Sequence, residues 1–100
     1  MFGSLFGGGA PVEINENAIL VDVRSPAEYS QGHAKKALNW PLDQLSTFLE
    51  KNSAMKSKEI VIYCASGARA GVAQNMMNRA GFDKVTNVGG IQAVAHLGLE

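Results

Sequence analysis

A single cysteine, Cys64, occupies a position in this 100-residue chain where a thiol could be made reactive. It follows a run of β-branched and aromatic residues at 60–63, and it precedes a short loop and a segment with apolar residues at helical spacing. This pattern predicts a strand, a loop and a helix in succession. The start of that helix would direct backbone N–H groups and the positive end of the helix dipole at the thiol.

Such surroundings would lower the pKa of the thiol. An ordinary cysteine has a pKa of about 8.5 and is only a few per cent thiolate at neutral pH. A helix N-terminus can contribute up to about 2 kcal/mol, which lowers the pKa by about 1.5. We therefore expect Cys64 to be close to half ionised and to act as a nucleophile. The loop that would form a cradle of backbone amides around the sulfur consists of Ala65, Ser66, Gly67, Ala68, Arg69 and Ala70.

Arg69 stands at the predicted start of the helix, where the helix dipole disfavours a cation. A residue that breaks a local rule often marks a functional site. We therefore expect the guanidinium of Arg69 to stabilise the sulfur of Cys64 or to bind an oxyanion.

Strand patterns alternate with helical patterns along the chain. Strands are expected at 19–23, 37–40, 60–63 and 84–88, and helices at 26–29, 43–51, 70–80 and 91–97. Ser25, Pro26 and Glu28 have the spacing of a capping box, and Gly81 is placed to end the third helix, which carries an apolar face through Val72. The alternation predicts an α/β domain with a mainly parallel central sheet and helices on both faces.

Polar residues follow a second predicted strand as well. Asp22 and Arg24 lie at the end of the strand at 19–23, and ligands of parallel sheets bind at the carboxyl ends of the strands. If the two strands are neighbours, these residues share one site with Cys64. We expect Asp22 and Arg24 to form a structural pair that braces the loop, and His33 to bond the backbone at a turn.

The composition describes one globular domain, with 46% apolar residues, 18% charged residues and a formal net charge of zero. This balance does not favour nucleic acid or an anionic membrane as a partner. A lone cysteine is typical of a reducing compartment, so we expect a cytoplasmic protein. No metal site is expected, because Cys64 and two distant histidines offer too few ligands.

Three segments are expected along the chain. Residues 1–11 are rich in glycine and are interpreted as a flexible leader, residues 12–98 as the folded domain, and residues 99–100 as a remnant of cloning.

Four motifs in order resemble those of the rhodanese domain. The stretch DVRSPAEY at 22–29 resembles its first signature, and GHAKKALNWPL at 32–42 resembles its second. The loop CASGAR at 64–69 resembles the active-site loop of single-domain bacterial members, and GF at 81–82 with VGGI at 88–91 matches the late pattern of the family. The likeness spans about residues 12–97.

The resemblance implies a sulfurtransferase that needs no metal or organic cofactor. In this family the cysteine takes a sulfane sulfur from a donor such as thiosulfate, becomes a persulfide, and passes the sulfur to cyanide or a protein thiol. The implied partners are a small sulfur donor and a thiophilic acceptor. Ala65 and Ser66 depart from the basic residues of thiosulfate-preferring members, which places the use of thiosulfate in question.

Two other kinds of function fit the same loop. Cys64 could sense oxidants through a sulfenic acid, or the domain could be a non-catalytic sulfur carrier or interaction module. A cysteine-based phosphatase is the weaker enzyme hypothesis. Its loop has the form C-x5-R, whereas Arg69 gives C-x4-R here, and the smaller cradle favours sulfur.

Overall fold

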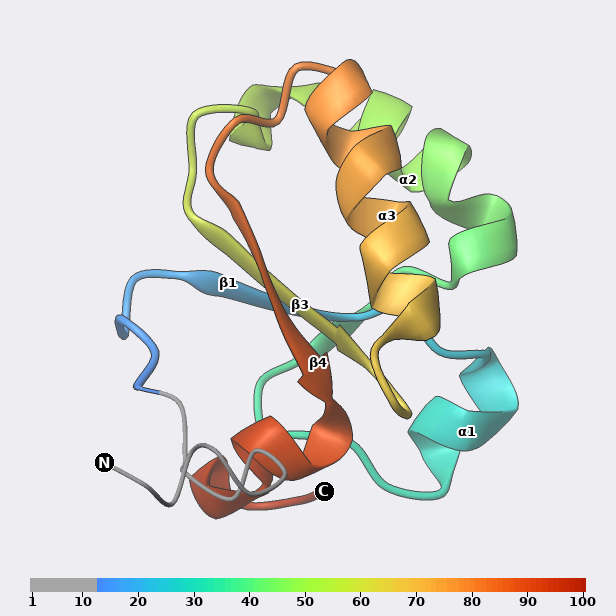
Figure 1. The fold of residues 1–100 in the computed structure, drawn as a ribbon, viewed down its shortest axis with the longest axis vertical. Helices are drawn as coiled ribbons and strands as arrows, with labels where there is room; N and C mark the ends of the chain where they lie inside the picture. Colours follow the sequence, from blue (N-terminus) through green and yellow to red (C-terminus); the bar gives the residue numbers. More distant parts are fainter. Residues whose placement is uncertain (1–12) are drawn as a thin grey trace.

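A four-stranded parallel sheet forms the centre of the computed structural model, which describes residues 13–100 (Figure 1). The strands lie in the order β2-β1-β3-β4. Their bounds are Ile19–Asp22 for β1, Leu38–Asn39 for β2, Ile60–Cys64 for β3 and Val85–Gly90 for β4. The predicted parallel sheet is confirmed, and β1 is indeed a neighbour of the strand that ends at Cys64. The interpretation of residues 1–11 as a leader lies outside the described residues.

Strand β3 is buried along its whole length because it contributes side chains to two cores. Ile60, Ile62 and Cys64 face the first core, whereas Val61 and Tyr63 face the second. Successive side chains of a strand point to opposite faces of the sheet. The continuous apolar sequence of β3 is therefore what a strand covered on both sides requires.

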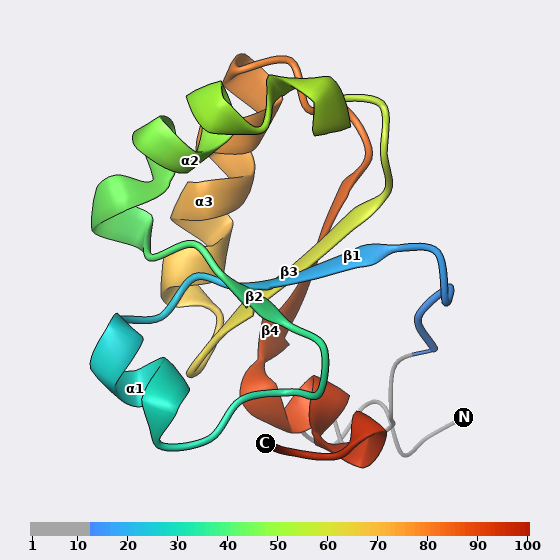
Figure 2. The ribbon, with the colours of Figure 1, turned by 180° about the vertical axis from the view of Figure 1, so that it is seen from behind.

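Helices cover both faces of the sheet, as predicted (Figures 1 and 2). Helices α2 (Leu45–Lys51) and α3 (Ala68–Arg79) contribute to the first core, and the 3₁₀ helix η4 (Ile91–Leu97) contributes Val94 to the second. Helix α1 (Pro26–Ser30) lies next to the loop between β3 and α3 in both views. Two short 3₁₀ helices, η2 (Leu42–Gln44) and η3 (Ser53–Met55), flank α2.

Two helix ends follow the predicted signals. At the start of α1, Ser25 Oγ accepts a hydrogen bond from the backbone N–H of Glu28 at 3.2 Å, and Glu28 Oε1 accepts one from the N–H of Ser25 at 3.1 Å. This is the predicted capping box. Helix α3 ends at Arg79, and Gly81 lies just beyond its C-cap with a φ of +96°, which glycine adopts readily. The N–H of Phe82 donates to the carbonyl of Met77 at 2.9 Å.

The details of α3 differ from the prediction. The helix begins at Ala68, two residues before the expected start. Its buried face consists of Ala70, Ala73 and Met77, and Val72 is 52% exposed. Of the predicted apolar face, Met76 and Ala80 pack against the first core, whereas the prediction is wrong for Val72. The physical reason is that small alanine side chains allow the helix to approach the sheet closely, whereas the prediction gave weight to bulky residues.

The last residues pair with the segment before β2. Leu99 forms an antiparallel bridge with Ala34, and the N–H of Glu100 donates to the carbonyl of His33 at 2.7 Å. Residues 99–100 thus have a place at this edge of the fold, and their interpretation as a cloning remnant stays a prediction. Between residues 13 and 100, no helix is long and apolar enough to cross a membrane.

Candidate active site

Cys64 is the last residue of β3, and the loop that follows closes over its sulfur. The residue is only 1% exposed, and its side chain faces the core beneath α3. The N–H of Gly67 donates to Sγ at 2.8 Å. Gly67 has a φ of +110°, a left-handed conformation that glycine adopts without strain. The strand, the loop and the helix predicted around Cys64 are therefore present, with the thiol at the start of α3.

Two opposing effects act on the pKa of the Cys64 thiol. Burial raises the pKa, and hydrogen bonds from backbone N–H groups lower it by favouring the thiolate. The N–H groups that lower it belong to Ala70, Gly67, Ser66 and Arg69. Together they outweigh burial, so the pKa of Cys64 lies below its ordinary value. Four of the six residues expected in the cradle act in this way, and the roles of Ala65 and Ala68 stay predictions.

The end of β4 supports the loop from the side. A Cβ atom at Gly90 would lie 2.5 Å from the carbonyl oxygen of Ala65, a separation at which the loop would have to shift. A Cβ atom at Gly67 would lie 3.5 Å from the Cα of Gly89. Gly90 thus fixes how closely the loop approaches the sheet. Sequence reasoning identified this glycine only as part of a motif, because its contact with Ala65 depends on the register of β3 and β4.

The side chain of Arg69 pairs with Glu28. Its Nη1 donates to Oε1 at 2.6 Å and its Nη2 to Oε2 at 2.9 Å, a two-pronged arrangement. The hydrogen bonds from Arg69 lower the pKa of Glu28 to about 2, and the bond to Glu28 raises the pKa of Arg69. Cys64 makes a smaller electrostatic contribution to the raised pKa of Arg69. The backbone N–H of Arg69 also acts on the sulfur, and its guanidinium is paired with Glu28. The expected role of the guanidinium, in stabilising the sulfur or binding an oxyanion, stays a prediction.

Glu28 is a residue of the site that sequence reasoning missed. The sequence assigns it only to the capping box, yet the same carboxylate joins the start of α1 to the first turn of α3. It also explains why a cation is tolerated at the start of α3, where the helix dipole opposes it. The sequence placed α1 and the Cys64 loop at the same carboxyl edge of the sheet, but it did not single out Glu28 among the possible partners of Arg69.

Asp22 and Arg24 form the predicted pair, but on the opposite face of the sheet from Cys64. Arg24 Nη2 donates to Asp22 Oδ2 at 2.7 Å, and the same nitrogen donates to the carbonyl of Gly32 at 2.7 Å. Asp22 is level with Tyr63 in the sheet and therefore shares the face of Tyr63. The pair braces the turn at Gly32. The hydrogen bonds that Arg24 donates to Asp22 and Gly32 do not reach residues 65–69, and the expectation that the pair braces the Cys64 loop stays a prediction.

Comparison with known proteins places this arrangement in a family. Residues 11–96 match the model of the rhodanese-like domain. The chain belongs to the rhodanese-like family. A sulfurtransferase of Allochromatium vinosum is 39% identical over 85 residues, which cover 84% of this chain and 78% of that protein.

Further relatives come from Escherichia coli. The thiosulfate sulfurtransferase PspE is 31% identical over 75 residues, covering 75% of this chain and 72% of the relative. A solved structure described as a rhodanese with anions has a TM-score of 0.75 and 28% identity, and the match covers 83% of this chain and 96% of that one. The predicted family and the predicted enzyme class, a sulfurtransferase of the rhodanese type, are confirmed.

His33 of this rhodanese-like domain packs against Tyr29 of α1. Its Nδ1 lies 2.8 Å from the carbonyl oxygen of Tyr29, and the two rings stack with their centroids 3.6 Å apart. Nε2 lies 3.5 Å from a carboxylate oxygen of Glu100. The predicted backbone contact is confirmed, and none of these contacts reaches Cys64.

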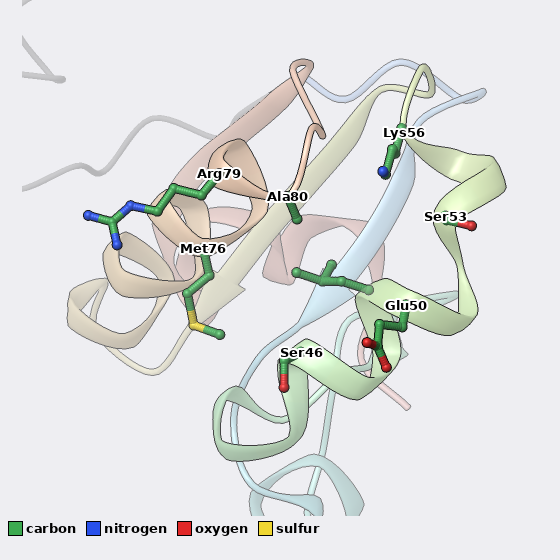
Figure 3. A pocket seen from close by; sticks show the side chains of 8 residues that line it. Ser46, Glu50, Ser53, Lys56, Met76, Arg79 and Ala80 are labelled. Carbon is green, nitrogen blue, oxygen red and sulfur yellow. The ribbon is translucent and has the colours of Figure 1, made fainter.

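A groove of about 760 Å³ lies on the rhodanese-like domain away from Cys64 (Figure 3). It is lined by Ser46, Leu49, Glu50, Ser53, Lys56, Met76, Arg79 and Ala80. These residues belong to α2, η3 and the C-terminal half of α3, or lie directly beside them, whereas Cys64 lies at the N-terminal start of α3. The groove is therefore not part of the Cys64 site.

Proposed function

We propose that this rhodanese-like domain transfers sulfane sulfur through a persulfide of Cys64. The observation that carries the proposal is the thiol at the start of α3, whose pKa is lowered by backbone N–H groups in spite of its burial. In the first half-reaction the Cys64 thiolate attacks the outer sulfur of a donor. A bond between Sγ and that sulfur forms as the bond to the leaving group breaks, and the leaving group takes the electron pair.

In the second half-reaction a thiolate or cyanide attacks the terminal sulfur of the Cys64 persulfide and releases the Cys64 thiolate. The backbone amides that stabilise the thiolate would also stabilise the persulfide anion. Loading extends the side chain by a sulfur–sulfur bond of about 2 Å. This extension offers the acceptor a sulfur that is less deeply placed than the thiol, which matters because Cys64 is 1% exposed.

The proposed partners are a small sulfur donor such as thiosulfate and a thiol, cyanide or protein acceptor. The cycle exchanges sulfur between nucleophiles without redox equivalents from elsewhere, so it requires no metal or organic cofactor. A lone thiol suits the reducing cytoplasm, and we propose that compartment as the place of the reaction.

Intact-protein mass spectrometry tests this proposal. The protein is incubated with a sulfur donor and then with cyanide or a thiol, beside the Cys64→Ser variant as the matched control. We expect a gain of one sulfur atom that the acceptor removes, and no gain in the variant. Sulfur loading that persists in Cys64→Ser would refute Cys64 as the carrier. No loading from any donor, together with oxidation of Cys64 to a sulfenic acid, would favour the redox-sensing alternative.

A further inference from the structure

We propose that Glu28 selects the sulfur donor by neutralising Arg69, so that the site prefers persulfides of low charge to a dianion such as thiosulfate. This inference rests on the sulfur transfer proposed above and concerns the donor that the same site accepts. Its basis is the distribution of charge around the Cys64 loop.

The charged side chains near the loop cancel in pairs. Two basic residues, Arg24 and Arg69, occur in the segments that directly follow the four strands. These segments are residues 23–25, 40–42, 65–69 and 91–93. Arg24 is paired with Asp22 at 2.7 Å, and Arg69 with Glu28 at 2.6 Å. The Cys64 thiolate then adds a negative charge that neither pair offsets.

The Glu28–Arg69 pair lies where an incoming donor would meet it. The side chains of Arg69 and Glu28 are 37% and 35% exposed, whereas Asp22 and Arg24 are buried. Both prongs of the Arg69 guanidinium are occupied by the carboxylate. A dianion near the loop would have to compete with Glu28 for this cation, and it would meet the thiolate without an unpaired positive charge.

Glu28 is held in place and does not act as a mobile counterion. Its Oε1 also accepts hydrogen bonds from the N–H of Ser25 at 3.1 Å and from Ser25 Oγ at 3.0 Å. An anion that drew Arg69 away would leave a carboxylate fixed beside the site. The capping box of α1 thus keeps the negative charge opposite Arg69.

The same transfer can be written for donors that differ in charge. Thiosulfate gives its outer sulfur to the Cys64 thiolate and leaves as sulfite, and a persulfide R–S–SH leaves as the thiol R–SH. Methanethiosulfonate leaves as methanesulfinate. It has a methyl group where thiosulfate has a charged oxygen, so these two donors form a pair of similar shape that differs by one negative charge.

The test compares kcat/KM for methanethiosulfonate, thiosulfate and cysteine persulfide in the wild type and in Glu28→Gln. The amide oxygen of Gln can still accept from the N–H of Ser25, while the variant leaves Arg69 without a charged partner. We expect Glu28→Gln to raise kcat/KM for thiosulfate relative to methanethiosulfonate on the order of tenfold. Glu50→Gln, which removes a carboxylate from the distant groove, is the matched control and should leave the ratio unchanged.

Where Glu28→Gln folds, adding Arg69→Gln to it should return the ratio of the two donors toward that of the wild type. A measurement on the wild type keeps the inference testable if Glu28→Gln folds poorly. In the wild type alone, kcat/KM for thiosulfate should rise with ionic strength more steeply than that for methanethiosulfonate, because salt screens repulsion between like charges. A thiosulfate rate that falls with salt would show that a free cation attracts the dianion, and would overturn the inference.

The outcomes separate the two proposals. If none of the three donors loads sulfur on Cys64, the proposed function itself fails. If all three load sulfur, and the thiosulfate to methanethiosulfonate ratio is the same in the wild type and in a folded Glu28→Gln variant, sulfur transfer stands and the role of Glu28 in donor selection is refuted.

Discussion

The ionisation of Cys64 depends on two opposing effects at its sulfur atom, burial and hydrogen bonding from the backbone. Burial at 1% exposure opposes a charge on the sulfur, and an unassisted cysteine in such a place would be an inert core residue. The loop reverses this outcome because it places backbone N–H groups around the sulfur, including that of Gly67 at 2.8 Å. The thiol is activated by the backbone, so the identity of most loop side chains matters less than the path of the chain.

Alkylation at varied pH tests this view of Cys64. Because the pKa of the folded thiol is lowered, the rate of reaction with a small reagent such as iodoacetamide should reach half of its maximum at a lower pH than in the unfolded chain. The matched control is the same chain in denaturant, where the midpoint should return to the ordinary value. A folded midpoint at or above that of the unfolded chain would contradict the activation of Cys64 by the loop.

At the scale of elements, the loop depends on two glycines with different tasks. Gly67 turns the loop with a positive φ, and Gly90 at the end of β4 leaves room for the carbonyl of Ala65. Gly71 in α3 differs from both, since a Cβ atom there would make only an ordinary contact of 3.9 Å with Asn87. Substitution of Gly90 and Gly71 by alanine should therefore have opposite effects.

Gly90→Ala should lower the free energy of unfolding by about 1–3 kcal/mol, because its methyl group forces the Ala65 carbonyl to move. The shifted loop should also raise the pKa of Cys64. Gly71→Ala should instead raise the free energy of unfolding by about 0.5–1 kcal/mol, because alanine favours a helix interior. Denaturant unfolding and the alkylation profile measure both effects. Equal stability of the two variants would show that the close approach of β4 to the loop is unimportant.

At the scale of the whole molecule, the Glu28–Arg69 pair connects parts of the chain that are 41 residues apart. It links α1, which follows β1, to α3, which follows β3. The two strands lie side by side. The pair therefore joins the segment that follows β1 to the segment that follows β3, at the same edge of the sheet. Its effect on stability depends on the charge of Glu28 and therefore on pH.

Acid should weaken this connection. Hydrogen bonding from Arg69 lowers the pKa of folded Glu28 to about 2, whereas an unfolded glutamate has a pKa of about 4.3. A lowered folded pKa contributes stability that is present above pH 4.3 and is lost as the pH falls toward 2. Because both side chains are about one-third exposed, the contribution should stay below about 1 kcal/mol.

The difference in free energy of unfolding between the wild type and Glu28→Gln measures this effect. It should be largest near neutral pH and should shrink between pH 4.5 and 2, because Gln carries no titrating charge. Glu50→Gln serves again as the control for general loss of a carboxylate. A difference that is independent of pH would show that the charge of Glu28 does not stabilise the fold.

The features that could be predicted from the sequence are those that short stretches of chain determine. The run at 60–63 predicts β3, and the spacing of Ser25 and Glu28 predicts the capping box. The position of Cys64 between a strand and a helix identifies it as a candidate nucleophile. The face on which Asp22 lies could not be predicted, because it depends on the register that sets Asp22 beside Tyr63.

The pairing of Arg69 with Glu28, which are far apart in the chain, could not be predicted from the sequence either. Arg69 has several conceivable carboxylate partners, and only the packing of α1 against the Cys64 loop selects Glu28. Similarly, the need for a glycine at position 90 follows from a contact with Ala65, which is 25 residues away along the chain. Residue types and local elements were therefore predictable, while the contacts that connect them were not.

The position of β3 between β1 and β4 has a consequence for the chain as it is synthesised. When Cys64 is added to the growing chain, Glu28 has already been made, but β4 and Gly90 have not. A nascent chain of this length carries an ordinary thiol without the support that β4 gives to the loop. We therefore expect the lowered pKa of Cys64 to appear only after β4 has been translated and has docked beside β3.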